Sequence, residues 1–211
     1  MEEILTNFFG SVWGQIVVAV AIAAVLIGAA FTDKRKFDVS VLVKTAILIA
    51  IAYVLNQSTT FMPFLRMPQG GSVTPFSMLF IVLVGYLFGI RQGILAGVAF
   101  GLLDLLINPY VIHPIQMLLD YPLAFGALGI GAFLRNKKNG LIKTYLVGIL
   151  GRFIVSSISG IIFFMDVTNG LAAGLYAALA YNFTYIAAEG AITVLVLLIP
   201  GLVKTFDKFK K

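Results

Sequence analysis

The segment PFSMLFIVLVGYLFGIRQGILAGVAFGLLDLLIN, residues 75–108, contains two apolar runs separated only by Arg91, Gln92 and Gly93. Apolar runs of this kind are typical of helices in a lipid bilayer, where every backbone polar group has to be hydrogen-bonded within the protein. The short connection predicts a tight helical hairpin over 75–90 and 93–108. Glycines on both runs permit close approach of the backbones, as small residues do between membrane helices; they are Gly85, Gly89, Gly97 and Gly101.

The apolar character extends beyond this hairpin to the rest of the chain. Of its 211 residues, 60% are hydrophobic and 11% are charged, and the mean hydropathy is +1.02. These values lie outside the range of ordinary soluble domains. A membrane β-barrel would show ten-residue segments of alternating polarity, and none occur. The sequence therefore predicts an all-α integral membrane protein.

Seven apolar segments are bounded by charged or turn-forming residues. They fall at 12–31, 39–56, 75–90, 93–108, 115–134, 142–164 and 174–203. We divide the chain into an extra N-terminal transmembrane helix with a basic cytoplasmic linker, residues 1–38, and a six-helix substrate-binding membrane domain, residues 39–211. The first segment lacks a small-residue cleavage site and is expected to stay as a membrane span.

The basic residues predict the orientation. With the N-terminus outside, the inner side receives all 15 Lys and Arg residues except Arg66, which lies outside, and Arg152, which lies within a helix. Cytoplasmic loops carry such an excess of Lys and Arg. We therefore expect a multi-pass protein of the cell membrane with a cytoplasmic C-terminus. This placement explains the net charge of +6 without a nucleic-acid partner, which would require a basic groove with interleaved aromatic residues.

Several classes of chemistry are disfavoured. The chain has no Cys and one His, too few for a thiolate metal site, a histidine metal cluster or a Ser-His-Asp triad. We expect no metal, no cofactor and no enzymatic activity, although a membrane-embedded enzyme is a rival hypothesis. No phosphate-binding G-x-x-x-x-G-K-[ST] loop occurs, so active transport would need an ion gradient or an ATPase partner.

Polar residues within the apolar segments mark a candidate cavity. In HPIQMLLDYP, residues 113–122, Asp120 lies about two turns below the outer surface and Gln116 lies one turn above it on the same face. Asp104 is also in the outer half. Carboxylates with aromatic side chains nearby suit a small aromatic cation, because rings stack and positive charge is attracted to ring faces.

Two further helices carry polar stripes. Arg152 and Ser156 share one face of the sixth segment, and Asn182, Tyr185 and Glu189 share one face of the seventh. Arg152 and Glu189 are at similar depth, and we expect a buried ion pair, since unpaired charges are costly in lipid. The outer loop 58–74, with Gly70 and Gly71, is either a lid over the cavity or a plain connection.

Four segments together resemble a known family. They are RMPQGGSVTPFSMLFIVLVGYLFGIRQGILAGVAFGLL (66–103), HPIQMLLDYPLAFGALGIGAF (113–133), RFIVSSISGIIFF (152–164) and YNFTYIA (181–187). They look like the thiamine-specific substrate-binding S components of energy-coupling factor (ECF) transporters, the ThiT/YuaJ family. The resemblance implies a six-helix protein that captures a vitamin from outside and docks on a membrane scaffold subunit with two cytoplasmic ATPases. The family's small-xxx-small docking motif falls on Ala46 and Ala50.

The resemblance also implies positions in the binding site. The family's acidic contact falls on Asp120, followed by Tyr121, its Asn falls on Asn182, and an aromatic contact falls on Phe164. A family Tyr would fall on Ala177, one place from Tyr176, and Ser156 stands where the family has His. With the polar-stripe and lid residues, the predicted substrate-binding set is Asp120, Tyr121, Gln116, Asn182, Phe164, Ser156, Tyr176, Tyr185, Gln69 and Gly70.

The leading hypothesis is an S component that binds thiamine, or one of its pyrimidine or thiazole precursors, and delivers it inward with its ATPase partners. Ser156 leaves the choice between thiamine and a precursor open. The alternative is a self-sufficient proton-coupled transporter of a small cationic solute, with a proton relay through Asp104, Asp120 or Glu189.

Overall fold

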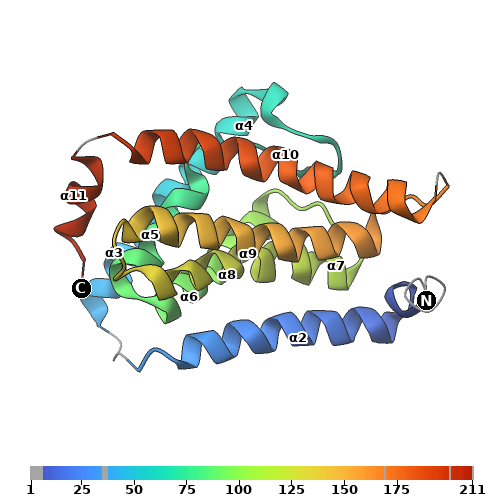
Figure 1. Ribbon diagram of the computed structural model, residues 1–211, viewed down its shortest axis with the longest axis horizontal. Coiled ribbons are helices and arrows are strands. Elements are labelled where there is room, and N and C mark those ends of the chain that lie inside the picture. The colour runs from blue at the N-terminus through green and yellow to red at the C-terminus, as the bar shows by residue number, and fades with distance from the viewer. Residues whose placement is uncertain (1–6, 35–37, 169, 200, 211) are drawn as a thin grey trace.

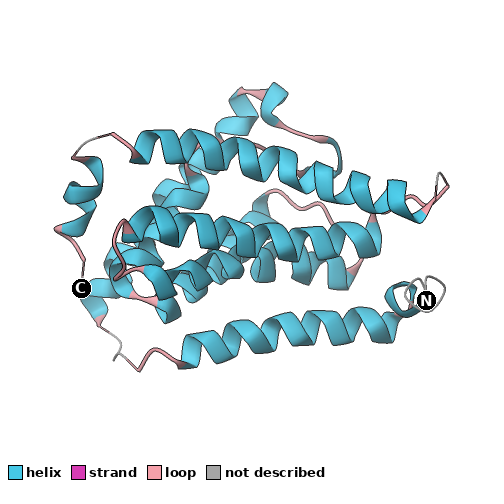
Figure 2. Ribbon diagram, viewed as in Figure 1, coloured by secondary structure: helices cyan, strands magenta, loops and turns pink. Residues whose placement is uncertain are grey.

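The computed structural model describes residues 7–34, 38–168, 170–199 and 201–210. These residues form helices and connecting loops, and their only β contact is an isolated bridge between Arg66 and Ser72 (Figure 2). Among them, 6 helices are long and apolar enough to cross a membrane. A shorter apolar helix, Ser77–Phe88, adds to these. The predicted all-α membrane fold is confirmed.

Each predicted apolar segment contains at least one helix (Figure 1). The membrane helices are α2 (Val12–Phe31), α3 (Val39–Asn56), α5 (Ser77–Phe88), α6 (Ile90–Ile107), α9 (Gly140–Phe163) and α10 (Leu171–Leu197). A further composite span, residues 114–134, runs through α7 (Pro114–Leu118), η3 (Leu119–Leu123), α8 (Ala124–Ala127) and η4 (Leu128–Leu134). The short elements are α4 (Ser58–Phe61), η1 (Pro63–Leu65), η2 (Pro68–Gly70) and α11 (Leu202–Asp207).

The hairpin of α5 and α6 turns earlier than predicted. Residues 91–93 lie within α6, and the chain reverses at Gly89, which has φ 104°. Only glycine adopts this backbone conformation without strain. The glycines of α6 pack against the 114–134 span: a Cβ at Gly97 would lie 2.1 Å from the Phe125 carbonyl oxygen, and one at Gly101 would lie 2.4 Å from that of Tyr121. Because both positions lack a side chain, α6 can pack closely against the 114–134 span, which carries Asp120.

The last predicted segment, 174–203, was too long at its C-terminal end. Helix α10 ends at Leu197, and α11 begins only after Gly201, at φ 91°. The Tyr86 hydroxyl of α5 donates to Asp207 Oδ1 of α11, and Phe206 packs against the core. The α11 helix therefore folds back onto the end of α5 instead of continuing the span.

Helix α5 is the centre of the bundle. All of its residues except Phe80 are buried, and it contacts α3, α6 and α9. At 12 residues it is too short to cross the hydrocarbon core, and the preceding segment reaches it as irregular chain. Irregular backbone is tolerated at membrane depth where it is buried in protein or lines a cavity. This segment lines the pocket described next.

Helix α2 lies at the edge of the molecule (Figure 1). It contacts α6, α7 and η3, and buries Ala19 and Leu26 in a cluster with Ile94. No residue of α2 lines the pocket. The extra N-terminal helix therefore packs beside the other helices without contributing to the pocket.

Candidate binding site

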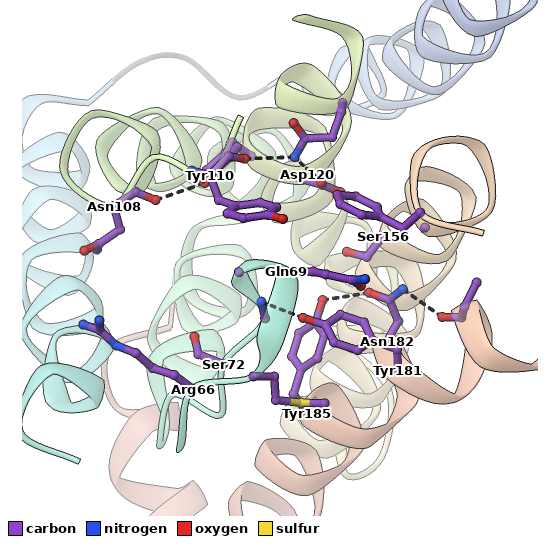
Figure 3. A pocket seen from close by; sticks show the side chains of 18 of the residues that line it. Arg66, Gln69, Ser72, Asn108, Tyr110, Asp120, Ser156, Tyr181, Asn182 and Tyr185 are labelled. Atoms are coloured by element: carbon purple, nitrogen blue, oxygen red, sulfur yellow. Dashed lines mark hydrogen bonds between the residues drawn. The ribbon is translucent and has the colours of Figure 1, made fainter. Parts of the chain in front are cut away.

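A pocket of about 620 Å³ lies between the irregular 66–72 segment, α6, the 114–134 span, α9 and α10 (Figure 3). Cavities of this size hold small molecules such as cofactors. Aromatic and polar side chains share its wall. The predicted residues that line it are Asp120, Tyr121, Gln116, Asn182, Phe164, Ser156, Tyr185, Gln69 and Gly70.

Tyr176 is the exception among the predicted residues. Its side chain is 75% exposed, and it does not line the pocket, whereas its neighbour Ala177 does. Successive residues of a helix point about 100° apart, so a shift of one position moves a side chain off the pocket wall. Tyr181, one turn further along α10, brings a tyrosine ring to the pocket instead.

Asp120 is held by a short relay of hydrogen bonds. Gln116 Nε2 donates to Asp120 Oδ2 at 2.6 Å and to the Tyr110 carbonyl at 3.1 Å, and Gln116 Oε1 accepts from the Ile112 amide at 3.1 Å. Asp120 lies in the π-helical turn η3, which also contains Pro122. Proline cannot donate the usual helical hydrogen bond, and a π-turn is a common way for a helix to absorb such a break near a functional site.

Tyr121 fixes the loop that closes this side of the pocket. Its hydroxyl donates to the Asn108 carbonyl at 3.0 Å and accepts from the Tyr110 amide at 2.7 Å. The Tyr110 ring in turn lies 6.2 Å from that of Phe164, at an interplanar angle of 25°. The two rings form a pair of roughly parallel aromatic faces at the pocket wall.

The opposite wall comes from α9 and α10. Asn182 Oδ1 accepts from the Tyr185 hydroxyl at 2.9 Å, and Asn182 Nδ2 donates to the Ala178 carbonyl at 3.0 Å. Ser156 lies on the same side in Figure 3. The Arg152 guanidinium lies 4.1 Å above the Phe125 ring, and its Nε has no hydrogen-bond partner among the described residues.

The expected ion pair between Arg152 and Glu189 is wrong. Glu189 instead accepts hydrogen bonds from Thr74 Oγ1 and the Met78 amide, both at 2.8 Å. The Met78 amide belongs to the first turn of α5, where free amides and the helix dipole favour a negative charge, and Thr74 lies just before this helix. Glu189 thus caps α5 from α10, and Arg152 acts on it only through longer-range electrostatic attraction.

The segment 66–72, which belongs to the outer loop, lines the pocket, and its role as a lid stays a prediction. Tyr181 of α10 accepts from the Gly71 amide at 2.9 Å and donates to the Pro68 carbonyl. Gly70, at φ 88°, packs against Tyr110: a Cβ there would lie 3.1 Å from the ring. The segment is therefore hydrogen-bonded to α10 on one side and packs against Tyr110 on the other.

Sequence reasoning missed several lining residues. Tyr110, Asn108 and Asn56 lie in or beside connecting segments, and Tyr181 lies on α10 outside the predicted set. Pro109 beside Tyr110 marked a turn but gave no direction to the side chain. Asp166, in the loop after α9, also lines the pocket, and a hydrogen bond from the Thr168 amide lowers the pKa of its carboxyl group. A negative charge is thus retained at this edge.

The two residues predicted to dock on a scaffold subunit lie outside the pocket. Ala46 and Ala50 are exposed on α3 and line no part of the pocket. The lone histidine is also outside it: His113 Nδ1 accepts from the Ile115 amide at 3.2 Å, and its ring stacks on Phe163. No group of three or more potential metal-ligating side chains occurs among the described residues.

Two comparisons with known proteins agree with this architecture. A family model described as "Thiamine transporter protein (Thia_YuaJ)" matches residues 42–210. The chain is also 33% identical over 171 residues to the thiamine transporter ThiT of Bacillus subtilis (strain 168), a match that covers 74% of this chain and 87% of that protein. The family match begins after α2, so it contains all the pocket-lining residues. The chain belongs to the thiamine transporter family.

Proposed function

We propose that this protein is the substrate-binding S component of an ECF-type transporter and that it binds thiamine in the described pocket. The single observation that supports this most is the pocket itself, in which a positioned carboxylate, Asp120, lies among aromatic side chains. Thiamine consists of an aminopyrimidine ring joined to a positively charged thiazolium ring, and both parts find complementary groups there.

Asp120 and Asn182 are the proposed contacts for the aminopyrimidine. The Asp120 carboxylate accepts from the exocyclic amine, and the Asn182 side chain and the Ser156 hydroxyl offer hydrogen bonds to the ring nitrogens. Ser156 is shorter than the histidine that the family resemblance implies at this position. A water molecule between the Ser156 hydroxyl and the ring would restore the reach of the longer side chain.

Energy for uptake comes from partners in this proposal. The sequence contains no phosphate-binding loop, and the exposed Ala46 and Ala50 on α3 offer a surface on which a scaffold helix could pack closely. The chain then acts as the capture subunit, with the pocket open to the outer side and docking through α3.

Uptake of labelled thiamine tests this function. Cells that lack their own thiamine transporters are supplied with this chain, either alone or together with an ECF scaffold subunit and two ATPases. Thiamine should enter only with the complete set, and a Walker lysine substitution in the ATPases should abolish entry. Equal uptake by the chain alone, collapsed by a protonophore, would contradict the proposal and support the proton-coupled alternative.

A further inference from the structure

A second carboxylate, Asp104 of α6, lines the same pocket. Its Oδ1 accepts hydrogen bonds from Asn56 Nδ2 at 2.7 Å and from Asn108 Nδ2 at 3.1 Å. Asn56 is at the end of α3, and Asn108 directly follows α6. Two amide donors from different segments therefore hold one oxygen of Asp104 in place.

The other oxygen of Asp104 has no hydrogen-bond donor. All bonds to this side chain end on Oδ1, and no ion pair involves it within the described residues. Arg66, the basic residue of the lid, is directed to the Thr60 hydroxyl at 3.1 Å. Asp104 is half-buried, and a carboxylate that is partly removed from water is stabilised by a donor or a cation. Oδ2 is accordingly available to a group inside the pocket.

The charges of the pocket wall leave one negative charge uncompensated. Three carboxylates line it, from Asp104, Asp120 and Asp166, against two guanidinium groups, from Arg66 and Arg152. Arg152 attracts Asp104, Asp120 and also Glu189, so it can balance only one of them. The excess suits a ligand with a single positive charge.

The two carboxylates belong to different parts of the wall. Figure 3 shows Asn108, which binds Asp104, on one side of the pocket together with Arg66, and Ser156 and Asn182 on the other. Asp120 is instead linked to Gln116. A two-ring ligand whose amine faces Asp120 and Asn182 would extend its second ring toward Asn108.

We propose that Asp104 is the residue that selects for the positive charge of the ligand: its free oxygen faces the cationic ring, while Asp120 binds the amine-bearing ring. This assignment rests on the proposed thiamine-binding function. Asn56 and Asn108 are positioning residues, because both donate to the same oxygen of the Asp104 carboxylate.

The test compares thiamine with a neutral analogue in which a triazole replaces the thiazolium ring. Calorimetry on the purified chain, or competition where heats are small, gives the dissociation constant of each compound. Their ratio is the preference for charge. Wild type should prefer thiamine, and Asp104→Asn should lower that preference at least about tenfold, about 1.4 kcal/mol. Asparagine keeps an acceptor for Asn56 and Asn108, so the local fold is retained.

Two matched variants sharpen the result. Asp104→Glu keeps the charge and should keep most of the preference, whereas Asp120→Asn should weaken both compounds and change the ratio less than Asp104→Asn does. If Asp104→Asn weakened both compounds by the same factor, or weakened neither, the ratio of the two dissociation constants would stay unchanged. That result would overturn the assignment without refuting thiamine binding. Failure of wild type to bind either compound would instead refute the proposed function.

Discussion

Glu189 places a carboxylate at the first turn of α5, deep among apolar helices. Its side chain is 1% exposed, and its oxygens accept from Thr74 and the Met78 amide. A short helix that begins inside the protein has unpaired amides that water cannot reach, so an acceptor has to come from another element. Glu189 supplies this acceptor and thereby also fixes the C-terminal end of the lid connection.

Replacement of Glu189 by Gln should therefore lower stability. Hydrogen bonds to a charged group contribute about 1.5–3 kcal/mol each, and the loss should appear as a reduced melting temperature of the detergent-purified protein. A double-mutant cycle with Thr74→Val isolates the bond between the two side chains. We expect a coupling energy of at least about 0.5 kcal/mol; strictly additive losses would refute the cap.

Sequence patterns at the residue scale identified which side chains are polar within the membrane, but not which atoms they meet. Arg152 and Glu189 were expected to pair because they lie at similar depth on adjacent helices. Their partners, the Phe125 ring and the α5 N-terminus, depend on the rotation of each helix and on where α5 begins. Neither quantity follows from periodicity in helices that are apolar on nearly every face.

At the scale of elements, the lid and α10 act as one unit. Tyr181 bonds two backbone groups of the lid, the Gly71 amide and the Pro68 carbonyl. Lid opening has to break both contacts, although neither lies in the hydrophobic core. The Tyr181 hydroxyl is thus placed to control how fast a ligand leaves.

Substitution Tyr181→Phe should accelerate dissociation of thiamine. Loss of two hydrogen bonds of about 0.5–1.5 kcal/mol each corresponds to a rate increase of roughly five- to hundredfold if both are broken in the transition state for opening. Stopped-flow displacement measures this rate. Tyr176→Phe is the matched control on the same helix, since that hydroxyl is exposed. An equal rate in Tyr181→Phe and wild type would remove Tyr181 from the lid.

The ends of the helices could be predicted from the sequence where charged or polar residues mark them. The segments 12–31 and 39–56 match α2 and α3 residue for residue, because charged residues separate them. The hairpin turn was placed at the polar Arg91 and Gln92, whereas the structure turns at Gly89. Backbone freedom, and not side-chain polarity, decides where so tight a reversal occurs.

For the molecule as a whole, the topology assigns the loops at the two ends of α9 to opposite sides of the membrane. Residues 135–139 precede this helix and carry Arg135, Lys137 and Lys138, while residues 164–170 follow it without a basic residue. The positive-inside rule places the first loop in the cytoplasm. This orientation is a prediction.

Single cysteines can test it, because the chain contains none. Val167→Cys and Lys138→Cys both introduce a thiol at an exposed loop position. A membrane-impermeant maleimide added to intact cells should label the cysteine at 167 and leave that at 138 unlabelled until the cells are permeabilised. The reverse pattern would invert the topology and place the pocket toward the cytoplasm.

The central claim is that one pocket, with Asp120 in its wall, captures thiamine. Calorimetric titration of the purified chain tests it directly. Wild type should bind thiamine at one site per chain, and Asp120→Asn should bind at least about tenfold more weakly, a loss of about 1.4 kcal/mol, at an unchanged melting temperature without ligand. Absence of binding by wild type, or equal affinity in the two proteins, would contradict the account.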